Sequence, residues 1–183
     1  MSRYPTLSTT LTAASVSATI FIVGLLIGYT SIEQLPAALT HLDAAGATEW
    51  SFLGILTRNL GAAALMYAGI VSGGVLSVIT MAAVAVYVGA TAKIGSMTVG
   101  LGAVAGGVAW YAPIEFLGCM AAACAGLYPA IAALSEKHQR QHGGPLKSYL
   151  HAVPHSLMLF AVAAALIAIG AGAEILVISQ QVR

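Results

Sequence analysis

The sequence predicts an all-α fold: a polytopic transmembrane helical bundle with about five crossings, forming a single domain over residues 1–183. Three observations lead to this prediction. Of the 183 residues, 59% are hydrophobic and only 7% are charged, whereas a soluble domain carries about 25% charged residues. The mean hydropathy is +0.91. The apolar residues also gather in sparsely charged runs that are long enough to cross a hydrocarbon core of roughly 30 Å.

The composition excludes several other classes of protein. A soluble enzyme would need more charged residues to coat its surface. A nucleic-acid binder would need a basic cluster, whereas the net charge here is +1. Two cysteines are too few for a disulfide scaffold. The lipid bilayer is therefore the expected surrounding of this chain.

The first two expected elements lie before residue 51. The run 11–29 is uncharged and would be about 29 Å long as a helix, so we expect an uncleaved first span. Segment 30–50 contains Glu33, Asp43 and Glu49 but no Lys or Arg. We expect it to be an amphipathic segment at the outer membrane surface.

The run 52–92 is too long for one span and about right for two. The best position for a turn in this run is Ser72-Gly73-Gly74, because glycine allows a tight turn. We therefore expect spans at about 53–71 and 75–92, followed by a polar break at 93–96.

The run 97–134 contains Pro113 near its middle and one charge, Glu115. Proline interrupts a helix, so the run is either two spans, or one span plus a re-entrant or interfacial helix. The last span is expected at about 153–178. We favour five crossings with a broken helix near Pro113, and six remain possible.

The basic residues predict the orientation of the chain. Cytoplasmic loops carry an excess of Lys and Arg. The polar segment 135–148, with Lys137, Arg140 and Lys147, should therefore be a cytoplasmic loop, together with Arg3. A six-span arrangement would export this basic loop, whereas five spans keep it inside. The expected location is the cell membrane, with the chain passing through it several times.

Small residues recur at four-residue spacing, which places them on one helix face. Such pairs allow close approach of helix backbones in lipid. They could form a homodimer interface or pack within one bundle, and we favour packing. The pairs are Gly24 with Gly28, Gly69 with Gly73, and Gly102 with Gly106.

Two carboxylates, Glu115 and Glu174, fall inside the apolar runs. A charged side chain at mid-membrane costs roughly 2.5–3.5 kcal/mol, so it normally faces a partner, the bundle interior or water. The candidate members of this polar site are Arg58, Asn59, Tyr111 and His155. The site could be a proton or cation relay or a ligand site; a structural pairing is the simpler interpretation, and we favour it.

Motifs for metal binding or catalysis are weak. The pairs His138–His142 and His151–His155 have helical spacing, but glycine or proline interrupts each region, and the five-residue gap between Cys119 and Cys124 is not typical of a thiolate site. We therefore expect no metal, no cofactor and no catalytic residues.

Several short motifs resemble the stage II sporulation protein M family of membrane proteins. The resemblance covers about 50–180. The motifs are Phe52 with Ile55 and Asn59, Gly69 to Gly74 with Gly89, Pro113-Ile114-Glu115 followed by Gly126-Leu127, and Ala171-Gly172-Ala173-Glu174. The family histidine four residues before its glutamate is Tyr111 here, and the glycine that follows that histidine is Ala112.

The resemblance implies a multi-span protein without catalysis that works with other membrane or ATPase subunits. We accordingly expect a non-enzymatic membrane subunit or accessory partner of a larger complex, for example the permease part of an ABC-type export or immunity system. We expect it to dock its partner through the basic loop 135–148. The alternatives are a self-sufficient transporter or channel that uses Glu115 and Glu174, and an intramembrane enzyme.

Overall fold

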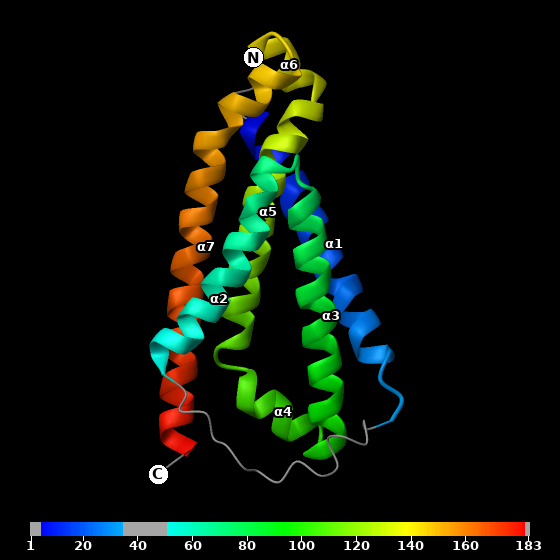
Figure 1. Ribbon diagram of the computed structural model, residues 1–183, viewed down its shortest axis with the longest axis vertical. Coiled ribbons are helices and arrows are strands. Elements are labelled where there is room, and N and C mark those ends of the chain that lie inside the picture. The colour runs from blue at the N-terminus through cyan, green and yellow to red at the C-terminus, as the bar shows by residue number, and fades with distance from the viewer. Residues whose placement is uncertain (1–4, 35–50, 182–183) are drawn as a thin grey trace.

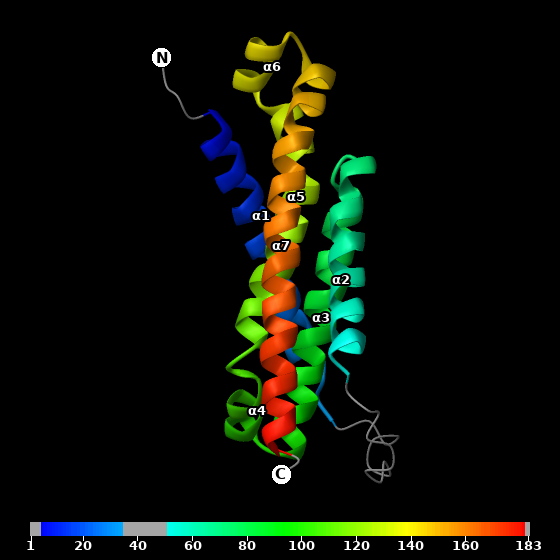
Figure 2. The same cartoon turned by 90° about the vertical axis from the view of Figure 1, so that its left-hand side faces the viewer.

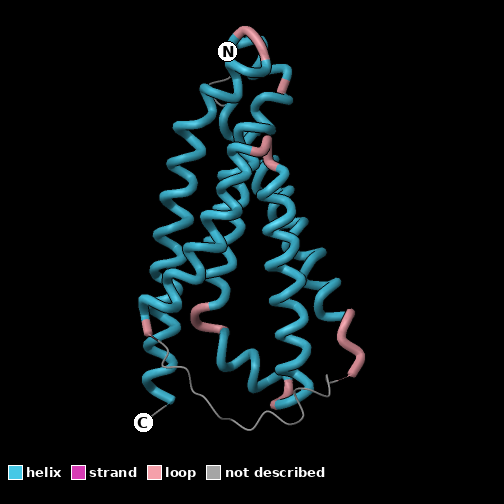
Figure 3. The backbone as a smooth tube through the Cα atoms, viewed as in Figure 1, coloured by secondary structure: helices cyan, strands magenta, loops and turns pink. Residues whose placement is uncertain are grey.

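The protein is an elongated helical bundle in the computed structural model, which describes residues 5–34 and 51–181 (Figure 1). Within these residues no strand forms, as Figure 3 shows. The elements are α1 (Pro5–Thr30), α2 (Phe52–Tyr67), a 3-10 helix η2 (Ala68–Val71), α3 (Val75–Thr98), α4 (Leu101–Val108), α5 (Ala112–Leu134), α6 (Glu136–His142) and α7 (Pro145–Gln181). Most of the expected amphipathic segment, 35–50, lies outside the described residues.

Five helices are long and apolar enough to cross a membrane. The spans are Leu7–Thr30, Phe52–Val71, Val75–Thr98, Ala112–Leu134 and Pro145–Ser179. Many large apolar side chains on them are exposed, as is required of surfaces that face lipid. The expected all-α bundle is confirmed, and the protein is membrane-embedded.

The turn at residues 72–74 lies where the sequence predicts it. Gly73 and Gly74 have φ of 61° and 92°, a backbone conformation that favours glycine. The predicted polar break at 93–96 is wrong, because α3 continues through it to Thr98. Lys93 fits into this helix because it lies near the end of the span, with its ammonium 5.1 Å from the centre of the Tyr29 ring.

The break predicted near Pro113 is where a new helix begins. α4 ends at Val108 and α5 begins at Ala112, so the interruption falls at 109–111. Pro113 lies in the first turn of α5, where its missing N–H costs no helical hydrogen bond. The short α4 lies across the end of the bundle and contacts α3 (Figure 1).

The segment 135–148, expected as a loop, is mostly helical. It forms α6 and the first turn of α7, separated by Gly143 and Gly144, which both have positive φ. α7 therefore begins at Pro145, where a proline is tolerated, rather than near residue 153. α6 and the first turn of α7 together form a helical cap at one end of the bundle (Figure 2).

α5 is the central helix. It contacts α1, α2, α3 and α7. Of the most apolar stretch of each span, 61% is buried in α5, compared with 22–28% in the other four. The small residues Ala122, Ala123 and Gly126 lie in the middle of α5 and let its neighbours approach closely.

Helices α1 and α3 interlock through glycines. A Cβ added at Gly28 would lie 2.9 Å from the Ala90 nitrogen and closer still to Val86, and one at Gly89 would lie 2.8 Å from the Tyr29 nitrogen. One at Gly24 would lie 2.7 Å from the Ala85 Cβ. Gly24 and Gly28 therefore pack within the bundle, as favoured above.

The other two glycine pairs behave differently. Gly69 packs on Ser77, but Gly73 lies in the turn, so the prediction that these two share a helix face is wrong. Gly102 and Gly106 lie on α4, and no described atom would meet a Cβ at either position within 4 Å. The favoured packing within the bundle is therefore not seen for this pair among the described residues, and a homodimer interface, the alternative above, stays untested.

Three buried serines tie the spans together by donating to backbone carbonyls of other helices. Ser17 bonds to Met120 at 2.8 Å, Ser77 to Met66 at 2.6 Å, and Ser156 to Ala125 at 2.6 Å. Tyr149 similarly donates to the carbonyl of Ile70. Such bonds satisfy polar groups in a phase without water.

The spans splay apart towards α4 in one direction. In the view of Figure 1 they converge towards α6 and spread apart towards α4, and we call the end at α4 the broad end. The C-terminal end of α7 lies at the broad end, as Figure 2 also shows.

Candidate functional site

A polar cluster lies in the broad half of the bundle, where three helices meet. α2 and α5 run from the broad end towards the cap, and α7 runs in the opposite direction (Figure 1). The beginnings of α2 and α5 therefore lie at the level of the end of α7. This arrangement brings together Asn59, Glu115 and Glu174, which are separated widely in sequence.

Glu115 has a direct partner on α2. The Asn59 Nδ2 atom donates a hydrogen bond of 2.7 Å to the Glu115 Oε1 atom. Glu115 lies in the first turn of α5, where the helix dipole favours a carboxylate. Glu115 is therefore near the end of its span, not at the mid-membrane depth considered above, because α5 begins only three residues before it.

Glu115 also meets a second carboxyl group. Its side chain interacts with the carboxyl group of Glu174 on α7. Two carboxylates at one site repel each other, so a proton on one of them is favoured.

Gly170 makes this approach possible. A Cβ added at Gly170 would lie 3.3 Å from the Glu115 nitrogen, 3.4 Å from Cδ and closer still to Cγ. Gly170 is four residues before Glu174, so both face α5 from the same side of α7. Glu115 thus lies against the backbone of Gly170 and beside the carboxyl group of Glu174.

Two further groups act on the pair. The guanidinium of Arg58 on α2 interacts electrostatically with Glu174. Tyr111 precedes α5; burial raises the pKa of its phenol, and the charges of Glu174 and Glu115 raise it further. Tyr111 therefore stays protonated near neutral pH.

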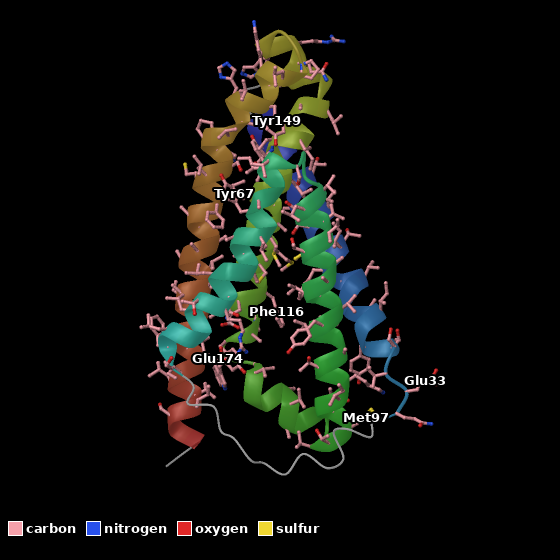
Figure 4. The ribbon with its side chains drawn as sticks, in the orientation of Figure 1. Glu33, Tyr67, Met97, Phe116, Tyr149 and Glu174 are labelled. Atoms are coloured by element: carbon pink, nitrogen blue, oxygen red, sulfur yellow. The ribbon has the colours of Figure 1, made fainter. Side chains whose placement is uncertain are left out.

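A cavity of about 400 Å³ lies next to the carboxyl pair. Its walls come from α1, α3, α4 and α5, and Glu115 lines it directly. Figure 4 shows Phe116, which also lines it, in the same half of the bundle as Glu174. Its lining residues are Leu25, Tyr87, Val88, Thr91, Ala92, Gly95, Val104, Val108, Tyr111, Ala112, Glu115 and Phe116.

His155, expected as a possible partner of the carboxylates, lies elsewhere. It is 19 residues from Glu174, or about 28 Å along α7. Its Nε2 atom is 3.3 Å from the Thr10 hydroxyl, and its ring is 4.7 Å from that of Tyr128. It belongs to a contact between α1, α5 and α7 in the half of the bundle nearer the cap.

Metal-ligating groups do not converge in the described part of the chain, where no three His, Cys, Asp or Glu side chains could hold an ion. Cys119 and Cys124 are buried free thiols on α5. The ring of His142 on the cap lies 4.6 Å from that of His151 in the second turn of α7. Arg140 and Lys147 are exposed on the cap as well, and Lys137 belongs to the same helix as Arg140.

Sequence reasoning missed Gly170 and the cavity. A glycine four residues before an intramembrane acid was a usable signal, since it marks the face on which a partner can approach. The cavity gave no such signal, because its walls come from four helices.

Comparison with protein-family models, curated proteins and solved structures finds no match for this chain.

Proposed function

We propose that this protein is a proton-coupled membrane transporter in which the Glu115–Glu174 pair binds the proton and the adjacent cavity binds the solute. One observation carries the proposal: Glu115 belongs both to the carboxyl pair and to the cavity wall. A proton and a solute therefore meet at the same side chain.

The charges of the cluster provide the coupling. With one shared proton, Arg58 and the two carboxyl groups sum to zero. Loss of that proton leaves one uncompensated negative charge in a poorly solvated site, which is costly. Either a cationic solute or the returning proton removes this cost. The binding of the proton and the binding of the cation therefore exclude each other.

The location and orientation complete the proposal. The exposed Arg140 and Lys147 on the cap favour a cytoplasmic position for it. The carboxyl pair and the cavity then lie in the outer half of the cell membrane.

Exchange in liposomes tests the proposal. Liposomes that contain the protein, a trapped pH dye and an acidic interior are given a panel of inorganic cations, organic cations, organic anions and amino acids. We expect at least one solute to collapse the pH gradient. Glu115→Gln should reduce this rate to that of empty liposomes, because the amide can neither release a proton nor carry a charge.

The control for this experiment is Glu33→Gln, which makes the same chemical change at an exposed residue after α1. It should exchange solute at the wild-type rate. A wild-type protein that collapses the gradient with no solute of the panel would contradict the proposal.

A second candidate function, a membrane subunit of a larger complex, is supported by the cap. The cap presents exposed basic residues beyond the spans, as a docking surface for an ATPase or other cytoplasmic partner requires. Replacing Lys137, Arg140 and Lys147 by alanine should weaken recovery of partners when the protein is purified from native membranes. Lys93→Ala is the control, because Lys93 lies near the C-terminal end of α3, at the opposite end of the bundle from the cap. Unchanged recovery of partners after the triple substitution would remove the cap from this role.

A further inference from the structure

We propose that the cavity beside Glu115 binds a lipophilic organic cation with one positive charge, and that this cation takes the place of the shared proton. The inference rests on the proposed function and names the class of its solute. Four properties of the site carry it: its wall chemistry, its charge, its aromatic side chains and its opening towards lipid.

The wall chemistry selects a ligand with a large apolar surface. At about 400 Å³ the cavity has the size of a small-molecule site, which is commonly 300–1,000 Å³ and mostly apolar. Its apolar wall residues include Leu25, Val88, Val104 and Val108. A sugar or amino acid would leave most of its polar groups unpaired against such walls, which is costly.

The charge of the wall selects a cation. Among the twelve described residues that line the cavity, Glu115 is the only acidic one, and none is Lys, Arg or His. An anion would be repelled by Glu115. Ca²⁺ requires about six to eight oxygen ligands, whereas the side chains of the wall offer only one carboxyl group, two phenols and the hydroxyl of Thr91.

Aromatic rings add to this selection. Tyr87 on α3, Tyr111 before α5 and Phe116 on α5 all line the cavity. The Phe116 ring is held in place by Phe21 of α1, with ring centres 5.1 Å apart. Faces of aromatic rings attract organic cations, most strongly where water is excluded.

The cavity is open at the side of α3. Tyr87 lines it and is nevertheless 70% exposed. Because α3 is a membrane span, this exposed side faces lipid. A lipophilic cation dissolved in the bilayer can therefore enter directly from the membrane.

Cation binding should release a proton, because it requires an ionised Glu115. The titratable and charged groups around the carboxyl pair are Arg58 on α2, which acts on Glu174, Tyr111 and Cys119 around the start of α5, and Tyr87 across the cavity. Glu174 shares the proton with Glu115, and Arg58 neutralises one carboxylate. One positive charge thus remains to be supplied.

Binding of tetraphenylphosphonium to the purified full chain in lipid nanodiscs tests the inference, measured by titration calorimetry. Tetraphenylborate, an anion of the same shape, is the matched ligand control. We expect only the phosphonium to bind, with an affinity that rises about tenfold per pH unit while the pair holds its proton, as exchange of one proton requires. Glu115→Gln should abolish binding, and Glu33→Gln should leave it unchanged.

A second variant separates the cavity from the carboxyl pair. Val108→Trp fills the cavity from α4 without altering Glu115 or Glu174, and it should also abolish binding. Equal binding of the phosphonium and the borate, or binding that survives Glu115→Gln, would overturn the inference. Circular dichroism of each variant verifies that its helices form.

The two proposals can fail separately. If the pH gradient collapses with a solute other than an organic cation and the phosphonium does not bind, the proposed transport stands and this inference fails. If the phosphonium binds as expected but no solute collapses the gradient, the cation site stands and the transport proposal fails.

Discussion

Gly28→Val is expected to destabilise the bundle strongly. The added Cβ would lie 2.8 Å from the carbonyl carbon of Val86 and 2.9 Å from the Ala90 nitrogen, both backbone atoms of α3. Backbone cannot move aside as a side chain can, so α1 and α3 must separate. Overpacking of this kind costs about 1–3 kcal/mol and occasionally more. We expect the melting temperature in detergent, followed by circular dichroism, to fall markedly.

Gly61→Val is the matched control for this prediction. Gly61 is also inside a helix, and no described atom lies within 4 Å of a Cβ placed there. Both variants carry the same β-branched residue, so any difference between them reports the contact between helices. Equal melting temperatures for the two variants would show that the α1–α3 interface does not limit stability.

Gly170→Ala is expected to disrupt the carboxyl pair. The new methyl group would displace the Glu115 side chain, which lies directly against Gly170. Glu115 then loses its hydrogen bond to Asn59 and its interaction with Glu174, and a hydrogen bond to a charged group contributes about 1.5–3 kcal/mol. We expect proton-coupled exchange to fall roughly tenfold or more, and the infrared C=O band of the protonated carboxyl to move to higher frequency.

Gly172→Ala, two residues further along α7, is the control. A Cβ there meets no described atom within 4 Å, so the variant should retain both the exchange rate and the infrared band. The same infrared spectrum for Gly170→Ala and the wild type would mean that the carboxyl pair does not depend on Gly170.

The sequence predicts the spans well because their signal is local. A run of apolar residues indicates a membrane-length helix wherever it occurs, and the glycines at 73 and 74 mark the turn between two of them. The start of α5 was harder to place, because Pro113 is compatible with either an interrupted helix or a helix start. The polar segments 93–96 and 136–142 were expected as a break and a loop, but both are helical. Polar residues are compatible with helical structure at the end of a bundle.

The site could be predicted in composition but not in geometry. Glu115, Glu174, Arg58 and Asn59 stand out as polar residues in apolar runs, and the structure brings them together. His155 also stood out, yet it lies in the other half of the bundle. Which side chains meet depends on the direction and depth of each helix, and those follow from packing against α5 rather than from any one segment.

The splay of the helices gives the bundle a different outline in the two leaflets. Figure 1 shows the spans spreading towards α4, whereas Figure 2, turned by 90°, shows α1 and α2 farthest apart in the half nearer the cap. Lipids that pack against the bundle therefore meet a differently shaped surface on each side of the membrane. The free energy of the splayed arrangement should accordingly depend on which lipids surround it.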